Sequence, residues 1–320
     1  MKVLRLHAPG DLRLHDEPMP EPAPGEILVQ VSSVGICGSD LHWFSEAGIG
    51  DAKLKQPLVL GHEAAGKIAS GPRKGERVAI DPAIPCQVCE YCLRGDPNLC
   101  EQVRFAGHAL VDGALCEYLA WPEKCLFRLP PALSDADGVM LEPLGVAMHA
   151  VNLARLRVGM RVGVFGCGPI GLLVIQLARL SGAAEVFASE PLPHRMEAAL
   201  HLGAQPWTPA QRLDVVFEVA GEDQAVDSAF EAVIPGGTVI LAGIPAEDRT
   251  SFTASVARRK GLTIKMVRRM KFTYPGAIQL VEGGKVDVRS LVSQQFPLEQ
   301  AQQAFSVAQR RDGLKIIIKM

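Results

Sequence analysis

Residues 161–171 read R-V-G-V-F-G-C-G-P-I-G, a short apolar strand that runs into a turn with three glycines. An apolar helical stretch follows the turn. Glycines at this spacing permit a tight turn and let the backbone approach a pyrophosphate at the start of the helix, where N–H groups lack partners. A proline fits the first helical turn for the same reason. The residues expected to contact a dinucleotide here are Gly166, Gly168, Pro169, Ile170 and Gly171.

An acidic residue after the next predicted strand bears on which dinucleotide binds. Glu190 follows the strand at 185–189, about twenty residues beyond the glycine turn. Its carboxylate can accept hydrogen bonds from both hydroxyls of an adenosine ribose and would repel a 2′-phosphate, which favours NAD over NADP. Arg195 lies nearby as a further cofactor candidate and could soften that preference, although an arginine beside an acid more often forms an ion pair. The alternative is a glycine-rich turn followed by an unrelated surface acid.

The rest of the chain shows two different sequence patterns. Residues 1–133 are rich in Pro and Gly and contain short alternating apolar runs, which are typical of strands between turns. From about residue 145 strands alternate with helices, which predicts a parallel, doubly wound sheet. We expect an α/β protein with a β-rich domain at 1–144, completed by 286–320, and an NAD-binding domain at 145–285.

Composition excludes several classes of protein. The 33 Lys and Arg residues are balanced by 35 Asp and Glu residues and scattered along the chain, so neither nucleic acid nor an anionic membrane is an expected partner. The N-terminus alternates like a strand and lacks the apolar core of a signal peptide. No apolar run approaches the length of a membrane helix. Eight cysteines without an export signal are interpreted as reduced thiols or metal ligands, and we expect a cytoplasmic protein.

Four of those cysteines, Cys86, Cys89, Cys92 and Cys100, have the spacing Cys-X2-Cys-X2-Cys-X7-Cys. Four thiolates in so short a loop match the tetrahedral demand of a structural zinc ion. Two alternatives are weaker, since a disulfide lacks a secretory context and ferredoxin-type clusters have three residues before the last cysteine. A zinc ion with four protein ligands has no open position, so this site is expected to hold shape and to perform no chemistry.

Further segments, taken with those above, resemble the zinc-dependent medium-chain dehydrogenases. The matching motifs, in the family order, are G-I-C-G-S-D-L-H at 35–42, V-L-G-H-E-A-A-G at 59–66, the four-cysteine lobe, L-E-P-L-G-V at 141–146 and G-C-G-P-I-G at 166–171. The resemblance covers essentially the whole chain and is closest to the sorbitol (polyol) dehydrogenase branch. It implies a GroES-like catalytic domain beside a Rossmann domain.

The resemblance also implies a second, catalytic zinc. Singly, a Cys, a His or a Glu is usually core or surface filler, but Cys37 and His62 match the family's ligands. Glu63 matches the carboxylate that completes the site, directly or through water, and Glu142 matches a second carboxylate near the metal. One thiolate, one imidazole and one carboxylate leave the fourth zinc position open, as a catalytic site requires. Which glutamate contacts the metal stays open.

Other residues match the proton path and the substrate pocket of the family. Ser39 and His42 match a relay through a hydroxyl, the cofactor ribose and an imidazole, and imidazole suits the solvent end because it exchanges protons near neutral pH. Trp43, Tyr118 and Arg268 align with positions that face substrate. Trp43 stands where polyol dehydrogenases usually carry a tyrosine, which puts sugar-alcohol specificity in doubt. Arg268 could instead be an ordinary surface arginine.

The expected activity is zinc-dependent oxidation of a secondary alcohol, a polyol or sugar acid, to a ketone with NAD as hydride acceptor. The expected assembly is a homotetramer or dimer with two zinc ions per chain. Within the family the alternatives are an L-threonine 3-dehydrogenase or a 2,3-butanediol dehydrogenase. Outside it, an NAD- and zinc-binding sensor without turnover is disfavoured because binding alone needs no proton relay.

Overall fold

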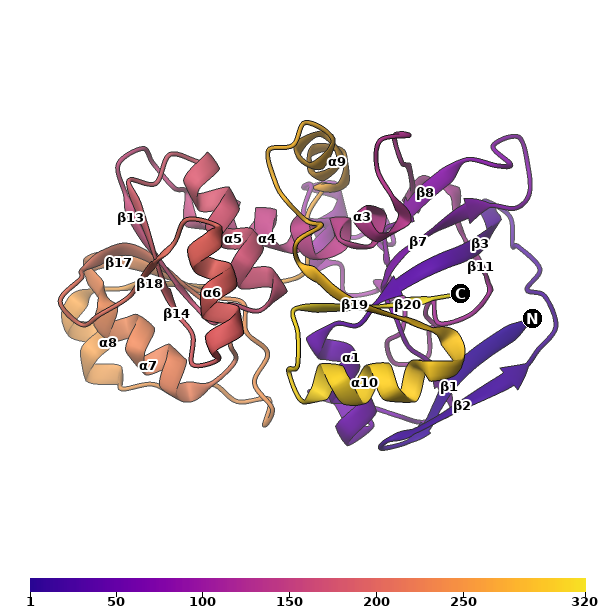
Figure 1. Ribbon diagram of the computed structural model, residues 1–320, viewed down its shortest axis with the longest axis horizontal. Coiled ribbons are helices and arrows are strands. Elements are labelled where there is room, and N and C mark those ends of the chain that lie inside the picture. Colours follow the sequence, from indigo (N-terminus) through magenta and orange to yellow (C-terminus); the bar gives the residue numbers. More distant parts are fainter. The chain divides into compact units, whose positions relative to one another are not determined.

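Two groups of elements make up residues 1–320 in the computed structural model. The first unit contains both chain ends and comprises Met1–Glu142, Tyr274–Gly284 and Val288–Met320. The second comprises Pro143–Thr273 and Lys285–Asp287. Figure 1 shows the elements of both units, with colours that follow the sequence from indigo at the N-terminus to yellow at the C-terminus.

The main feature of the first unit is a seven-stranded sheet with the order β12-β8-β7-β3-β20-β19, in which β11 also pairs with β3. Its strands are β3 (Glu26–Gly35), β7 (Glu63–Ile68), β8 (Arg77–Ile80), β11 (Tyr118–Pro122), β12 (Leu126–Arg128), β19 (Val292–Pro297) and β20 (Lys315–Lys319). The last strand of the chain, β20, pairs antiparallel with β3, with Ile318 opposite Val34. In Figure 1 the yellow C-terminal strands accordingly lie beside indigo N-terminal ones.

Alternating side chains of these strands form the core of the first unit. Along β3, Val29, Val31 and Val34 are buried, as the alternating run predicts. Helices from distant parts of the chain cover this core, and the ring of Phe44 lies 5.0 Å from that of Phe305. The other elements of this unit are β1 (Lys2–Ala8), β2 (Asp11–Asp16), α1 (Gly38–Glu46), β4 (Gly48–Ile49), β5 (Ala52–Lys53), β6 (Leu58–Val59), β9 (Ala83–Ile84), α2 (Glu90–Leu93), η1 (Pro97–Leu99), β10 (Arg104–Phe105), η2 (Glu123–Cys125), α3 (Asp135–Val139), α9 (Tyr274–Glu282), η3 (Leu298–Gln300) and α10 (Ala301–Gln309).

Helix α9 lies in the first unit, whereas the expected boundary at 285/286 placed it in the second. The reason is Tyr274, whose ring stacks on Phe127 with centroids 4.7 Å apart. Its hydroxyl donates to the carbonyl of Ile80 at 2.7 Å, and the side chain is buried. A tyrosine buried with its hydroxyl satisfied fixes the segment that carries it.

The second unit is built on a six-stranded parallel sheet with the order β15-β14-β13-β16-β17-β18. Its strands are β13 (Arg161–Phe165), β14 (Glu185–Ser189), β15 (Gln205–Pro206), β16 (Leu213–Glu218), β17 (Val233–Leu241) and β18 (Thr263–Met266). Its helices are α4 (Leu141–Ala154), which begins in the first unit, α5 (Pro169–Leu180), α6 (Pro193–His201), α7 (Asp223–Ala232) and α8 (Ala254–Lys260). Numbered from β13, the order is 3-2-1-4-5-6, the doubly wound arrangement that binds dinucleotides where the strand order reverses. The predicted fold class is confirmed.

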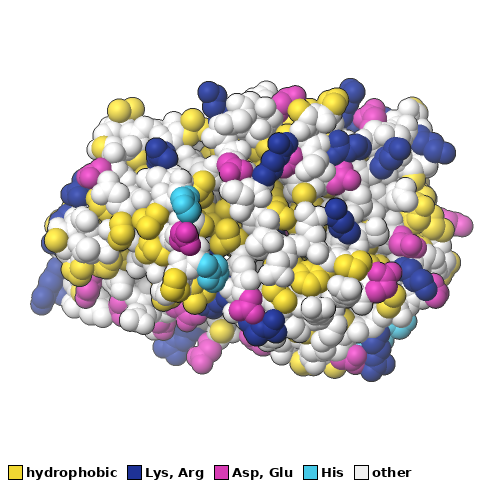
Figure 2. Space-filling view, in the orientation of Figure 1, with side chains coloured by type: hydrophobic (Ala, Val, Ile, Leu, Met, Phe, Trp, Pro, Cys, Tyr) yellow, Lys and Arg dark blue, Asp and Glu magenta, His cyan; other side chains and the backbone are white.

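The surface is mixed in charge. On the face drawn in Figure 2, basic and acidic side chains are interspersed, which agrees with the net charge of −2. No helix combines the length and the apolar character needed to cross a bilayer.

One lysine stabilises the end of a helix in the second unit and provides a test of the fold. The Nζ of Lys260 donates to the carbonyls of Phe230, Glu231 and Val233 at 2.8, 2.7 and 2.9 Å, at the C-terminus of α7. A cation suits that end because the helix dipole is negative there.

Substituting Lys260→Met should destabilise the protein by about 1.5–3 kcal/mol, the range for bonds to a charged group. The melting temperature should fall accordingly, whereas the exposed neighbour substitution Arg259→Met should leave it unchanged. Equal melting temperatures for both variants would contradict this role.

Candidate functional site

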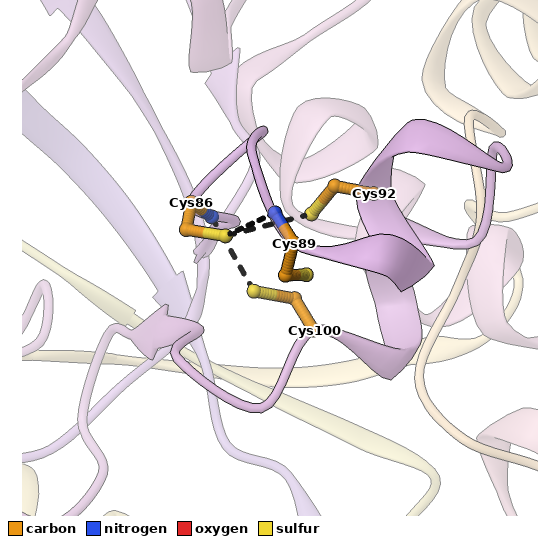
Figure 3. Close-up of side chains that lie close together, drawn as sticks. All are labelled: Cys86, Cys89, Cys92 and Cys100. Carbon is orange, nitrogen blue, oxygen red and sulfur yellow. Dashed lines mark hydrogen bonds between the residues drawn. The ribbon is translucent and has the colours of Figure 1, made fainter.

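The four-cysteine lobe has the geometry of a zinc site. The sulfur atoms of Cys86, Cys89, Cys92 and Cys100 all lie within 4.8 Å of one another (Figure 3). The Sγ atoms of Cys86 and Cys92 are 4.0 Å apart. A tetrahedral ion with Zn–S bonds of about 2.3 Å separates its sulfurs by about 3.8 Å, so this cluster fits zinc.

Backbone groups of the lobe favour the thiolate form of Cys86, whereas burial raises the pKa of the Cys92 thiol to about 12. The N–H of Cys89 donates to the Sγ of Cys86 at 3.3 Å, and the N–H of Cys86 donates to the Sγ of Cys100 at 3.4 Å. The backbone N–H groups of Val88 and Cys89 lower the pKa of the Cys86 thiol to about 6. Turn geometry and ligand chemistry therefore agree within this one short segment.

Zinc content tests this lobe directly. Cys89→Ser should reduce bound zinc by about one ion per chain and lower the melting temperature, because metal binding contributes to the stability of such lobes. Elemental analysis of the purified protein measures the zinc. The control is Cys125→Ser, since Cys125 donates to the carbonyl of Ala83 and a serine can keep that bond. Unchanged zinc in the Cys89 variant would rule the lobe out as a metal site.

The second candidate set comes from two paired strands. In the antiparallel register of β3 and β7, Gly35 lies opposite Glu63, so Cys37 and His62 meet at one end of the pair. The donor atoms of Cys37, His62 and Glu63 lie within 4.8 Å of one another. A Cβ on Gly35 would lie 2.2 Å from the Oε2 of Glu63, so only glycine leaves room for that carboxylate.

A buried aspartate orients the thiol and the imidazole. Asp40, in the first turn of α1, accepts from the N–H groups of Cys37 at 2.9 Å and Gly61 at 3.1 Å. Its Oδ1 lies 3.4 Å from the Nδ1 of His62, which leaves the other ring nitrogen for a metal. Burial disfavours the charged imidazole, but Asp40 and Cys37 outweigh it and raise the pKa of His62. Asp40 is not among the site residues predicted from the sequence, although its place three residues after the N-cap Cys37 is a recognisable signal.

A buried lysine holds the carboxylate of the set. The Nζ of Lys315 donates to the Oε1 and Oε2 of Glu63 at 2.7 and 2.6 Å and to the carbonyl of Ile36 at 3.1 Å. Lys315 and Glu63 are 3% and 1% exposed. A metal bound by Cys37 and His62 would therefore share the carboxylate with this ammonium group. Lys315 lies in an apolar run at 314–319 that carried no signal for such a role.

Glu142 is the second carboxylate expected near the metal. It is 5% exposed. Burial raises its pKa to about 7, with His62 opposing the rise and Glu63 adding to it. The structure groups Cys37, His62 and Glu63 as potential ligands and leaves Glu142 outside that set. Direct ligation of the metal by Glu63 stays a prediction.

The Lys315–Glu63 pair allows a stability test. Lys315→Met would leave a buried carboxylate without its partner, which costs about 3–5 kcal/mol, and the melting temperature should fall steeply. The double variant Lys315→Met with Glu63→Gln should recover part of that loss because the charge is removed as well. Lys319→Met, at an exposed position of the same strand, is the matched control. A single variant as stable as the control would show that the pair contributes little.

The proton-path candidates lie on α1. The Oγ of Ser39 is 3.4 Å from the Nε2 of His62. His42 lies one turn further along, 18% exposed, with its Nδ1 3.4 Å from the Oε1 of Glu46. Ser39 is thus beside a potential metal ligand and His42 reaches solvent. Their joint action as a relay stays a prediction.

The substrate-pocket candidates come from both units. Trp43 is 1% exposed and packs edge-on against His108, with ring centroids 5.6 Å apart. Tyr118 is partly buried on β11, opposite Gln30 of β3. Arg268 is an exposed residue of the second unit. Their contact with substrate stays a prediction. Phe105, whose ring lies 5.3 Å from that of His62, was missed by the sequence analysis.

The glycine turn of the second unit has the shape that the sequence predicts. Gly166 has a φ of +96° directly after β13, and Gly168 is the N-cap of α5. A Cβ on Gly171 would lie 2.0 Å from the carbonyl oxygen of Gly166, so the helix can approach the strand this closely only with glycine. Pro169 and Ile170 form the first turn of α5, at the N-terminus where a pyrophosphate is favoured.

Glu190 and Arg195 both lie beside this turn. The Oε2 of Glu190 accepts from the N–H of Cys167 at 2.7 Å, and its Oε1 accepts from the N–H of Leu192 at 3.0 Å. Each oxygen keeps a lone pair for a ribose hydroxyl. A guanidinium nitrogen of Arg195 lies 3.6 Å from the position of a Cβ on Gly168. The residues present fit the adenosine half of a dinucleotide.

Comparison with known proteins agrees with this geometry. Residues 23–131 match the family model of the alcohol dehydrogenase GroES-like domain, and residues 169–283 match that of zinc-binding dehydrogenases. The sorbitol dehydrogenase of Gallus gallus is 35% identical over 337 residues, covering 98% of this chain and 95% of that protein. The structure of L-idonate 5-dehydrogenase from Escherichia coli has a TM-score of 0.93 at 26% identity, covering 100% of this chain and 98% of that one. A zinc-binding dehydrogenase of Sinorhizobium meliloti 1021 bound to NADP has a TM-score of 0.90 at 28% identity, covering 100% of this chain and 99% of that one.

Proposed function

The chain belongs to the zinc-dependent medium-chain dehydrogenase family, close to the sorbitol dehydrogenases, and from that premise we propose that it oxidises a polyol or related sugar acid at a secondary alcohol, giving a ketone and NADH. The observation that carries the proposal is the set of Cys37, His62 and Glu63, which offers three ligands of the kinds a catalytic zinc takes. The names of two similar proteins, a sorbitol and an idonate dehydrogenase, support a polyhydroxylated substrate.

The residues of the site have separate roles in holding the metal and in supporting its ligands. Cys37, His62 and Glu63 would hold the zinc, which when bound supplies Lewis-acid polarisation of an alcohol oxygen. Asp40 keeps the imidazole of His62 in one orientation, and Lys315 keeps the carboxylate of Glu63 in place.

Other residues would serve proton removal and cofactor binding. The hydroxyl of Ser39, beside His62, can accept the proton of the alcohol while it gives its own proton to a ribose hydroxyl of a bound cofactor, and the imidazole of His42 can pass a proton on to solvent. In the second unit the glycine turn would hold the pyrophosphate and Glu190 the adenosine ribose of a dinucleotide, which when bound would supply a hydride acceptor. The four-cysteine lobe has no open ligand position and would serve the fold.

Initial rates of NADH formation test the proposal and its rivals together. We expect the kcat/KM for sorbitol, xylitol or L-idonate to exceed that for L-threonine and 2,3-butanediol by about tenfold or more. A site built to hydrogen-bond several hydroxyl groups keeps unpaired polar groups when the substrate lacks those hydroxyls. A faster reaction with threonine or the diol would assign the protein to the rival substrate class. If the protein binds NADH and zinc but oxidises none of these alcohols, the result would favour the alternative of an NAD- and zinc-binding sensor.

The preference for NAD over NADP rests on Glu190 and has its own test. Glu190→Gln keeps the size of the side chain but removes the charge that repels a 2′-phosphate. The ratio of kcat/KM for NADP to that for NAD should rise by about tenfold, equal to about 1.4 kcal/mol. Glu197→Gln, an exposed acid of α6, is the control. An unchanged ratio, or a wild-type protein that prefers NADP, would contradict the assignment.

We further propose that the protein is a cytoplasmic homo-oligomer, a dimer or tetramer. None of the eight cysteines forms a disulfide, which fits a reducing compartment. The edge strand β18 exposes Ile264 by 37% and Met266 by 65%, and an exposed apolar edge can pair with a strand of another chain. Light scattering of the protein as it elutes from a size-exclusion column would measure the mass of the assembly. The mass of a monomer would refute the proposed oligomer.

A further inference from the structure

The sheet of the second unit contains a buried carboxylate that the proposed mechanism does not use. Glu218 is the last residue of β16 and is 1% exposed. Its Oε1 accepts from the backbone N–H groups of Ala220 at 2.8 Å and Gly221 at 2.7 Å. Burying a carboxylate is costly unless it is fully hydrogen-bonded, so its position on this strand calls for a reason.

The position of Glu218 is at the edge of the sheet where a dinucleotide would lie. Strand β16 is the neighbour of β13 across the point where the strand order reverses. Open α/β sheets bind their ligands outside the carboxyl ends of the strands at that point. The adenosine ribose would be held by Glu190 after β14, on one side of β13. The remaining half of the dinucleotide must then cross to the other side, over the ends of β16 and β17.

The turn that Glu218 holds packs directly on the glycine turn. The N–H of Val219 donates to the carbonyl of Phe165 at 2.9 Å. A Cβ on Gly166 would lie 2.9 Å from the backbone nitrogen of Ala220, so the two turns touch through backbone atoms. The turn at 219–221 therefore borders the turn that would receive the pyrophosphate.

The same turn also contacts the segment after β17. A Cβ on Gly243 would lie 2.1 Å from the nitrogen of Gly221 and 2.8 Å from the Oε2 of Glu218. A Cβ on Gly221 would lie 2.5 Å from the carbonyl oxygen of Ile244. The N–H groups of Ala242 and Gly243 donate to the backbone carbonyl of Glu218 at 2.8 and 3.2 Å. One residue thus links three segments that end on the same edge of the sheet.

We propose that Glu218 is a positioning residue for the nicotinamide half of the cofactor. Its carboxylate, bonded to consecutive N–H groups, fixes the turn at 219–221 between the glycine turn and residues 242–244. A glutamine could keep its carbonyl oxygen on both N–H groups but would lose the negative charge that strengthens these two bonds, and so would loosen that turn. The inference rests on the proposed function, because it assumes that a nicotinamide dinucleotide occupies this edge.

The test compares two ligands that share the adenosine half, using the full-length zinc-loaded protein. NADH reaches the ends of β16 and β17, whereas ADP ends at the pyrophosphate. Glu218→Gln should raise the Kd of NADH by about tenfold, the effect of losing a charge-assisted bond, and that of ADP by less than about twofold. Glu185→Gln is the control, because Glu185 begins β14 at the opposite edge of the sheet and pairs with Arg161 on the surface. It should change neither Kd.

Several outcomes would overturn the inference. Unchanged binding of NADH by Glu218→Gln would refute it, and so would an equal loss for NADH and ADP, which would indicate general support of the sheet. If Glu218→Gln does not fold, Glu218→Asp keeps the charge but shortens the reach, and the same unequal loss is then required. A wild-type protein that binds ADP and NADH equally poorly would instead overturn the proposed function, and this inference with it.

Discussion

The candidate catalytic site depends on the pairing of β20 with β3, which brings Lys315 to Glu63 in the interior of the first unit. Two opposite charges at 2.6 Å, exposed by 3% and 1%, are stable there only because each neutralises the other. The pair fixes the carboxylate beside Cys37 and His62, and Asp40 fixes the imidazole in the same way. The potential metal ligands are therefore held by a shell of buried charges that must all be in place together.

Glycine supplies the second constraint, because in both units functional groups sit where no side chain would fit. Gly35 leaves room for the carboxylate of Glu63, and Gly171 lets α5 approach the end of β13. Gly243 leaves room for the carboxylate of Glu218. In each case a polar group is placed by backbone contact, which is stiffer than contact between side chains. Pre-organised sites in enzymes need such rigid support.

The two potential zinc sites differ in how far apart their ligands lie in the sequence. The lobe takes four cysteines from residues 86–100, and its own turns aim the sulfurs and favour the thiolate of Cys86. The second set takes its ligands from the N-cap of α1 and from residues 62–63 at the start of β7, and its support from β20, so it exists only when the sheet is complete. The first can form locally, whereas the second is a product of the whole unit.

The sequence alone determined the features that depend on short-range spacing. The strand, glycine turn and helix at 161–180, the four-cysteine lobe and the change from β-rich to alternating texture were all predictable, because each is encoded within a few neighbouring residues. Only the tertiary structure decided that Lys315 pairs with Glu63, that Tyr274 attaches α9 to the first unit, and that Glu218 links three strand ends. Those contacts depend on strand register across long separations, and a buried charge is recognisable only once its partner has been brought to it.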